Sequence, residues 1–348
     1  MACRADTDLQ VTASRAGVID RAARARDRGL FVFRVNICFH SKKKGVGPYR
    51  PSSGLQSKFP RFSLRSSSPE NAILTAWRQT LERRGDIPAV IAPDGSVHRT
   101  FHQIESEAQE LAVRFECFAP GSVVGIQIGN SERWPAVLLA LFRRELIPLP
   151  LGRHVETAEL EAALVTCGAA GLLTTDNGSL SVHSRSGVNG NPWTGTAPQF
   201  LKLTSGTTSA PRAVRFQAHQ LVADCDNICE TMGITDEDVN FGVIPFSHSY
   251  GFSNLVTPLL CRGIRLVASE DRLPRAIVNN LARSGATVFP GMPVFFDKLA
   301  ALVGSPDLPC LRLCISAGAP LTRAVGEVFT GRYGLKIHTF YGASECGG

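Results

Sequence analysis

A run of small hydroxyl residues surrounds one glycine at positions 204–208, where the sequence reads TSGTT. Gly206 allows the positive φ angle with which consecutive backbone N–H groups curl into a nest for an anion. Arg212 follows, and its forked guanidinium suits a phosphate group. The composition of this stretch alone fits a phosphate-binding loop and a solvent-exposed linker about equally. The hydroxyl donors are Thr204, Ser205, Thr207 and Thr208.

A histidine and a tyrosine follow a predicted strand in IPFSHSYG, residues 244–251. A lone histidine is more often structural than functional. His248, however, stands between a strand end and a predicted helix, and ligands of parallel sheets bind beyond the carboxyl ends of strands. This position favours a functional role for His248.

Two more strand-like runs end in short loops, ISAGAP at residues 315–320 and FYGASE at residues 340–345. Gly318 has small neighbours that would let a flat ligand approach the backbone. Tyr341 offers an aromatic face, and Glu345 offers hard carboxylate oxygens of the kind that suit Mg²⁺. Each loop taken singly is weak evidence for a site.

The segments that must position these residues alternate between strand and helix patterns. SVVGIQIGN and LRLCISAG predict buried strands, whereas WPAVLLALFRR predicts an almost entirely apolar helix. Strands that are apolar throughout favour parallel sheets covered by helices on both faces, which is an α/β fold. The first helix is predicted after Ser68, in a capping pattern with Asn71. Residues 176–198 are rich in Asn, Gly, Ser and Pro and are expected to form the main internal linker.

Two common nucleotide-binding classes are excluded by missing patterns. The lysine of GxxxxGK[ST] is absent from the hydroxyl-rich stretch, so this is not a P-loop NTPase. No GxGxxG follows the first strand, where the sequence reads VGIQIGNSERW, and a Rossmann oxidoreductase is excluded on that ground.

The net charge of +7 is unevenly distributed along the chain. Residues 1–67 contain 14 of the 37 basic and 4 of the 30 acidic residues, a balance of +10. The remaining 23 basic and 26 acidic residues give −3, so the body predicts no nucleic-acid-binding face. We expect residues 1–67 to be a basic, disordered extension, either an organelle transit peptide or a leader that is not native. No apolar run is long enough to predict a transmembrane segment.

The ten cysteines lie singly along the chain, without a CxxC pair that would support a zinc site. The closest pairs, Cys225/Cys229 and Cys310/Cys314, are four residues apart. Buried, reduced thiols are the favoured interpretation, which predicts a reducing compartment and a cytoplasmic protein.

The order of the four motifs resembles the adenylate-forming superfamily of acyl-CoA synthetases, peptide-synthetase adenylation domains and luciferases. TSGTTSAPRAV, PFSHSYG, SAGAPL and YGASE occur in that family's order between Ser68 and Gly348. The resemblance implies that residues 68–348 form a truncated large N-terminal AMP-binding domain made of two doubly wound βαβ-type subdomains. It also implies that the chain lacks the family's following β-rich subdomain and C-terminal domain, so that it is expected to be inactive alone.

The same resemblance implies a role for each matching residue. Residues Thr204, Ser205, Gly206, Thr207 and Thr208 would bind the β- and γ-phosphates of ATP. Gly318, Ala319 and Pro320 would line the adenine pocket. Tyr341, with Gly342 after it, would stack on adenine, Ser344 would bind the α-phosphate and Glu345 would bind Mg²⁺. His248 would lie beside the acyl carboxylate, and Arg212 would replace the family's loop lysine. Ser209 and Ala213 stand where the family has glycines, which predicts a less mobile loop.

The implied reaction is ATP-dependent activation of a carboxylic acid as acyl-AMP, followed by transfer to the thiol of CoA or of the phosphopantetheine on an acyl carrier protein. Amino-acid-activating relatives tend to place an aspartate near the FSHSYG position, and none stands beside His248, so we expect a fatty or aryl acid. An amino-acid adenylation domain and a non-catalytic fragment that only binds ATP or AMP stay open as alternatives.

Overall fold

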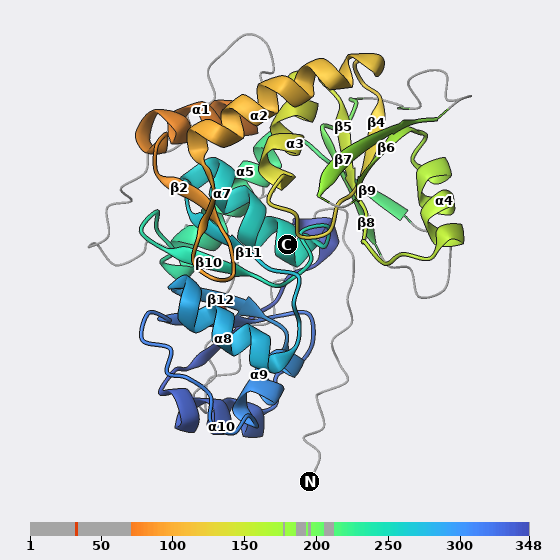
Figure 1. The fold of residues 1–348 in the computed structure, drawn as a ribbon. Coiled ribbons are helices and arrows are strands. Elements are labelled where there is room, and N and C mark those ends of the chain that lie inside the picture. Colours follow the sequence, from red (N-terminus) through yellow and green to blue (C-terminus); the bar gives the residue numbers. More distant parts are fainter. Residues whose placement is uncertain are drawn as a thin grey trace, which may run out of the picture.

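This computed structural model describes the backbone of residues 32–33, and residues 71–176, 178–185, 193, 196–204 and 212–347. Figure 1 shows two α/β units, and the described helices include none that is long and apolar enough to cross a membrane. The first helix, α1 (Ala72–Arg84), is capped by Asn71, whose side chain accepts hydrogen bonds from the N–H groups of Ile73 and Leu74. The cap is therefore Asn71 itself, whereas the expected partner Ser68 lies outside the described residues.

The larger unit is built on a sheet with the strand order β1-β14-β13-β12-β10-β11-β2-β3. Neighbouring strands in this order run parallel, except that β2 and β3 are antiparallel. The strands are β1 (Val32–Phe33), β2 (Pro88–Ile91), β3 (Val97–Thr100), β10 (Val239–Gly242), β11 (Arg265–Ala268), β12 (Val288–Gly291), β13 (Leu313–Ser316) and β14 (Ile337–Phe340).

Successive residues along these strands enter two different cores, because side chains of a strand alternate between its faces. Leu266 and Leu313 pack in one core, while the residues that follow them, Val267 and Cys314, pack in the other. The first core holds α1, α5 (Ala218–Met232) and α7 (Thr257–Arg262). The second holds α8 (Pro274–Ser284), α9 (Pro293–Ala300) and α10 (Arg323–Tyr333). Helices on both faces confirm the predicted α/β fold class.

The smaller unit contains a sheet of order β5-β4-β6-β7. Three of its strands are parallel, namely β4 (Val123–Gln127), β5 (Ile147–Pro150) and β6 (Ala169–Asp176). Strand β7 (Ser179–Ser184) runs antiparallel to β6. The prediction that residues 176–198 form a linker is thus wrong for β7, because alternating polar residues also suit the exposed face of an edge strand. The helices here are α2 (Phe101–Arg114), α3 (Trp134–Arg143) and α4 (Thr157–Thr166), with a 3₁₀ turn at Phe115–Cys117.

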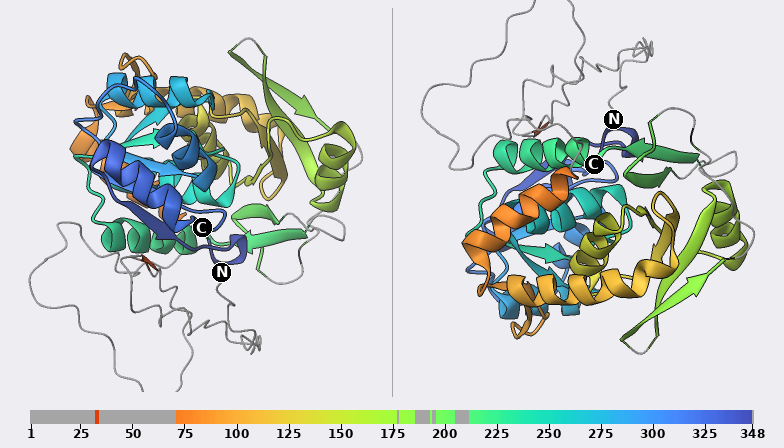
Figure 2. Two further views of the ribbon diagram at one scale, coloured as in Figure 1. Left: turned by 90° about the horizontal axis from the view of Figure 1, so that it is seen from below. Right: turned by 90° about the horizontal axis from the view of Figure 1, so that it is seen from above.

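A two-stranded hairpin of β8 (Phe200–Thr204) and β9 (Arg212–Phe216) flanks the hydroxyl-rich stretch. The register pairs Thr204 with Arg212. Both views in Figure 2 show the hairpin beside the C-terminal end of the chain. The stretch that it closes, residues 205–211, lies outside the described residues.

Candidate functional site

Three of the sequence motifs follow strands whose carboxyl ends lie side by side. Strands β12, β13 and β14 are parallel neighbours in register, with Gly291 opposite Ser316 and Ser316 opposite Thr339. Strand β10 is the next neighbour of β12. The loops after β10, β13 and β14 therefore open on one edge of the sheet, which is the edge where open α/β sheets bind ligands.

The loop after β10 is held by the buried side chain of Asn130, which follows β4 in the other sheet. Its Nδ2 lies 3.0, 3.1 and 2.9 Å from the carbonyl oxygens of Gly242, Ile244 and Ser269 and donates to them. Its Oδ1 accepts a hydrogen bond of 2.9 Å from the N–H of Phe246. One amide therefore fixes the backbone that leads to His248. Sequence reasoning missed this role, because a single Asn after a strand has no distinctive spacing.

Two side chains after His248 connect the motifs to each other. The Ser249 hydroxyl donates to the Ser344 hydroxyl at 2.9 Å. The buried Tyr250 hydroxyl donates to the carbonyl oxygens of Gly291 and Ile315, at 3.3 and 3.1 Å. Its ring stacks on Phe340 with a centroid distance of 6.0 Å. The structure therefore brings SHSYG, SAGAP and YGASE together. It gives Tyr250 a positioning role and adds Ser249, which the sequence did not single out, as a second positioning residue.

His248 begins the helical segment after this loop. It caps the short helix α6 (Ser249–Gly251), and its Nδ1 accepts a hydrogen bond of 3.2 Å from the N–H of Tyr250. A π-helical turn (Phe252–Val256) follows before α7. Desolvation, and after it the positive charge of Lys202, lower the pKa of His248 below its usual value. The imidazole is therefore neutral near pH 7, which favours a polar contact with a substrate over an ion pair.

The loops after β13 and β14 present an open surface. Gly318 has φ +85°, and a Cβ there would meet only the Met292 Cε, at 4.0 Å, among the described atoms. Ala319, Pro320 and Gly342 are exposed, and the ring of Tyr341 is 70% exposed. The exposed carboxylate of Glu345 makes no hydrogen bond or ion pair with another described residue.

The hairpin contributes the residues at the two ends of the hydroxyl-rich stretch. The half-buried Thr204 donates through Oγ1 to the carbonyl oxygen of Arg212 at 3.4 Å, and the Arg212 side chain is exposed. The other predicted phosphate ligands, Ser205, Gly206, Thr207 and Thr208, lie outside the described residues. Their roles stay predictions.

An open pocket of about 640 Å³ adjoins the loop of His248, where the loops after β4, β5, β10 and β11 meet. Ser247 and Asn130 line it from one side. Arg153 and Glu270 form an ion pair of 2.5 Å at its rim, and Glu270 also accepts from the Asn130 N–H at 2.9 Å. The pocket also contains His154 and Arg272, neither of which makes a hydrogen bond or ion pair with another described residue.

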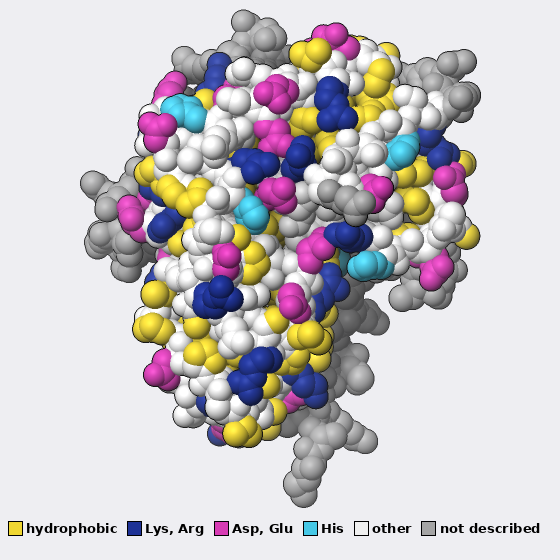
Figure 3. Space-filling model, in the orientation of Figure 1, with side chains coloured by type: hydrophobic (Ala, Val, Ile, Leu, Met, Phe, Trp, Pro, Cys, Tyr) yellow, Lys and Arg dark blue, Asp and Glu magenta, His cyan; other side chains and the backbone are white. Residues whose placement is uncertain are grey.

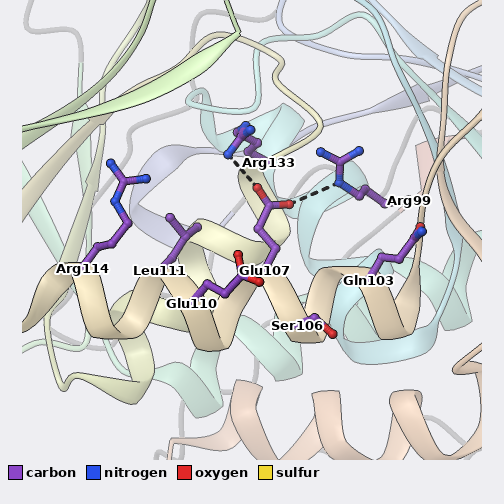
Figure 4. Close-up of a pocket in the computed structure, with 8 residues that line it drawn as sticks. All are labelled: Arg99, Gln103, Ser106, Glu107, Glu110, Leu111, Arg114 and Arg133. Carbon is purple, nitrogen blue, oxygen red and sulfur yellow. Dashed lines mark hydrogen bonds and ion pairs between the residues drawn. The ribbon is translucent and has the colours of Figure 1, made fainter.

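A second pocket, of about 360 Å³, lies along α2 and contains none of the motif residues. Figure 4 shows Glu107 between two arginines, bonded to Arg99 at 3.3 Å and to Arg133 at 2.8 Å. Basic and acidic side chains are likewise interspersed over the face shown in Figure 3. Glu107 thus offsets part of the positive charge of Arg99 and Arg133, while Arg114 donates to the carbonyl oxygen of Leu180 at 2.9 Å.

The cysteines only partly match their prediction. All eight described cysteines are free thiols, and five are buried: Cys167, Cys225, Cys229, Cys261 and Cys314. Cys117, Cys310 and Cys346 are exposed, so the expectation of burial is wrong for these three. Cys310 precedes β13 outside any helix, and Cys314 lies in β13, so their four-residue spacing does not place them on one helix face. The described residues contain no group of three or more His, Cys, Asp or Glu side chains that could hold a metal ion.

The family model of the AMP-binding enzyme matches residues 77–191 and 183–348. This chain belongs to the AMP-binding enzyme family, which confirms the resemblance seen in its motifs.

Comparison with individual proteins supports the same class. The chain is 29% identical over 222 residues to the benzoate–CoA ligase of Thauera aromatica, covering 60% of this chain and 40% of that protein. It is 23% identical over 332 residues to the putative acyl-CoA synthetase YngI of Bacillus subtilis (strain 168), covering 77% of this chain and 60% of that protein. The chain thus spans about 40% to 60% of the length of these relatives.

Solved structures share the fold. The N-terminal domain of FACL13 from Mycobacterium tuberculosis superposes with a TM-score of 0.69 at 17% identity, covering 79% of this chain and 77% of that one. The anthranilate CoA ligase AuaEII in complex with anthranoyl-AMP superposes with a TM-score of 0.66 at 20% identity, covering 78% and 60%. This chain therefore has the fold of the N-terminal portion of such enzymes.

Proposed function

We propose that the whole protein uses ATP to activate a fatty or aryl carboxylic acid as acyl-AMP and passes the acyl group to the thiol of CoA or of a carrier protein. The observation that supports this most strongly is the convergence of SHSYG, SAGAP and YGASE on one sheet edge, joined by the Ser249–Ser344 hydrogen bond. Benzoate and anthranilate, named in two relatives, favour an aryl acid.

In the first step, a carboxylate oxygen attacks the α-phosphorus of ATP, the bond to the bridging oxygen breaks and pyrophosphate leaves. Catalysis of such a step depends on positioning and on stabilising the phosphate charge. The open backbone at Gly318 and the exposed Tyr341 ring suit the adenine, and Ser344 suits the α-phosphate. Arg212 and the hydroxyl residues 204–208 would bind the β- and γ-phosphates. His248, neutral at pH 7, would position the acid.

Glu345 suits a magnesium ion that would be bound mainly by the phosphate oxygens of ATP. Mg²⁺ usually binds through one or two carboxylates together with phosphate oxygens and water, and Glu345 offers one unpaired, exposed carboxylate. The ion would neutralise charge on the triphosphate when bound.

In the second step, the acceptor's sulfur attacks the acyl carbonyl carbon and AMP leaves with the bonding electrons. CoA and phosphopantetheine both carry phosphate. The pocket beside Ser247 offers Arg272 and His154 for an anionic acceptor, and it adjoins the loop of His248. We propose that the acceptor approaches from this side.

The test is ATP–pyrophosphate exchange by the whole protein with a panel of benzoate, octanoate, palmitate and phenylalanine. We expect exchange with one or more of the first three acids and none with phenylalanine. Exchange with the amino acid alone would support the adenylation-domain alternative. Binding of ATP without exchange for any acid would support the non-catalytic alternative.

A further inference from the structure

Lys202 is a lysine buried in β8, two residues before the hydroxyl-rich stretch begins. Its side chain is 4% exposed. The ammonium donates to the Ser253 hydroxyl at 3.1 Å and to the carbonyl oxygen of Gly347. Ser253 also donates to the Gly347 carbonyl oxygen, at 3.0 Å. One ammonium thus contacts the helix that follows SHSYG and the turn that follows YGASE.

The surroundings of Lys202 are otherwise apolar apart from one carboxylate. The rings of Phe216 and Phe252 have their centroids 5.2 and 5.1 Å from the ammonium. Asp224 of α5 is 5% exposed, and its Oδ2 has no hydrogen-bond partner among the described atoms. Gly347 lies against this carboxylate, since a Cβ at Gly347 would be 2.7 Å from the Asp224 Cγ.

Burial disfavours both charges. It lowers the pKa of Lys202 to about 8, although Asp224 opposes this shift, and it raises the pKa of Asp224 to about 6, although Lys202 and Ser253 oppose it. Buried charge pairs are often no more stabilising than apolar residues of the same volume. Stability therefore gives little reason for this pair, whereas the hydrogen bonds of Lys202 to two motif-bearing segments give a specific one.

We propose that Lys202, neutralised by Asp224, is a positioning residue that fixes the β8–β9 hairpin against the segment 344–347. It so sets the distance from Thr204 and Arg212, at the ends of the hydroxyl-rich stretch, to Ser344 and Glu345, which are proposed for the α-phosphate and Mg²⁺. The hydroxyl-rich stretch begins two residues after Lys202. The Lys202 ammonium is hydrogen-bonded to Gly347, which follows YGASE, and to Ser253, which follows SHSYG. This inference rests on the proposed function, because the distance matters only if one nucleotide spans it.

The test separates positioning from stability with a pair of substitutions. Lys202→Met leaves the Asp224 carboxylate buried without its counter-charge, and we expect it to lower both the unfolding midpoint and the affinity for Mg·ATP. The double variant Lys202→Met/Asp224→Asn removes both charges, so we expect its unfolding midpoint to recover. Its affinity for Mg·ATP, measured by calorimetry, should stay about tenfold weaker than that of the unmodified protein, because the bridging hydrogen bonds are still missing.

A matched control lies in the larger sheet, at the amino-terminal end of β10 and therefore at the opposite end of that strand from the loop of His248. Asp238, before β10, is bonded to Arg312 and to the Thr287 hydroxyl. Asp238→Asn should lower the unfolding midpoint and leave Mg·ATP affinity unchanged. Affinity that recovers with stability in the double variant, or that falls equally in the control, would overturn the proposed role of Lys202.

Hydrogen exchange gives a readout that needs no nucleotide. In the double variant, amides of residues 200–204 and 344–347 should exchange faster, while those of β12 should not change. Unchanged exchange at both segments overturns the inference even if the unmodified protein binds ATP. Faster exchange in a protein that binds no ATP would refute the proposed function and leave the structural link standing.

Discussion

Single side chains at this site act mainly by forming hydrogen bonds with the backbone of neighbouring loops and strands. Asn130 satisfies three carbonyl oxygens and one N–H group from two loops, and Tyr250 bonds the ends of two strands. Neither side chain needs to touch a substrate to matter. The exposed residues, such as Tyr341 and Glu345, are those that are free to bind a ligand.

Replacement of Asn130 by alanine should be costly. Asn130→Ala leaves buried carbonyl and N–H groups unpaired, so we expect the free energy of unfolding to fall by about 2–4 kcal/mol. Urea denaturation measures this. Asn130→Asp keeps the acceptor for Phe246 but faces three carbonyl oxygens with a carboxylate, and it should be at least as destabilising. An aspartate variant as stable as the unmodified protein would contradict this assignment of the amide donors.

Tyr341 allows a test of the adenine site that does not affect stability. Tyr341→Ala removes a stacking face, and we expect affinity for ATP to fall about tenfold with no change in the unfolding midpoint. Tyr341→Phe keeps the ring and should bind ATP as well as the unmodified protein. If the phenylalanine variant loses as much affinity as the alanine variant, the hydroxyl and not the ring binds the nucleotide.

At the scale of elements, apolar strands and helices with strong periodicity were predictable and elements at the edges were not. The helix at α3 and the strands at β4, β10 and β13 follow directly from buried apolar runs. Strand β7 was missed because its polar residues resemble a loop. The four motifs could be found from residue types and order. The bonds of Asn130, Lys202 and Ser249 could not, because each joins residues more than 50 positions apart.

The buried carboxyl of Asp224, on helix α5, should make the free energy of unfolding depend on pH. Because the pKa of Asp224 is raised from 3.8 to about 6, the folded state binds more protons than the unfolded state between these values. The contribution of Asp224 to stability is present at low pH and is lost as the pH rises through about 6. The stability of Asp224→Asn relative to the unmodified protein should therefore rise as the pH increases from about 4.5 to about 6.5, as measured by urea denaturation at several pH values.

The control for this measurement has the opposite sign. Burial opposes ionisation of Asp238, but its hydrogen bonds to Arg312 and Thr287 and the backbone at Thr235 lower its pKa overall. Its stabilisation is present above the unfolded pKa and is lost as the pH falls through the folded pKa. Asp238→Asn should lose stability relative to the unmodified protein as the pH rises through that window. If the stability of both variants, relative to the unmodified protein, changed with pH in the same direction, the pKa shifts assigned to Asp224 and Asp238 would be contradicted.

At the scale of the whole molecule, the packing around the two sheets and the hairpin determines which side chains are exposed to solvent. Thiols are a convenient measure, because the five buried cysteines are distributed over both units and the three exposed ones lie on different surfaces. Burial also raises the pKa of Cys167 to about 11 and that of Cys314 well above its usual value. Cys167 and Cys314 are therefore both hidden and unreactive.

Alkylation of the native protein with iodoacetamide should label Cys117, Cys310 and Cys346 and should spare the five buried thiols. Peptide mass spectrometry identifies each site, and alkylation in urea provides the fully labelled reference. Rapid labelling of Cys225 or Cys314 in the native protein would contradict the burial of the cores on the two faces of the larger sheet.

The position of β2 in the larger sheet has a consequence for biosynthesis. Val90 of β2 pairs with Leu266 of β11, which is 176 residues later in the chain. At synthesis rates of about 5–20 residues per second, β2 leaves the ribosome roughly 10–35 s before its parallel partner exists. During that interval the apolar strand and the buried face of α1 have no sheet to cover them. We therefore expect the nascent chain to keep these apolar surfaces exposed until translation has passed β11.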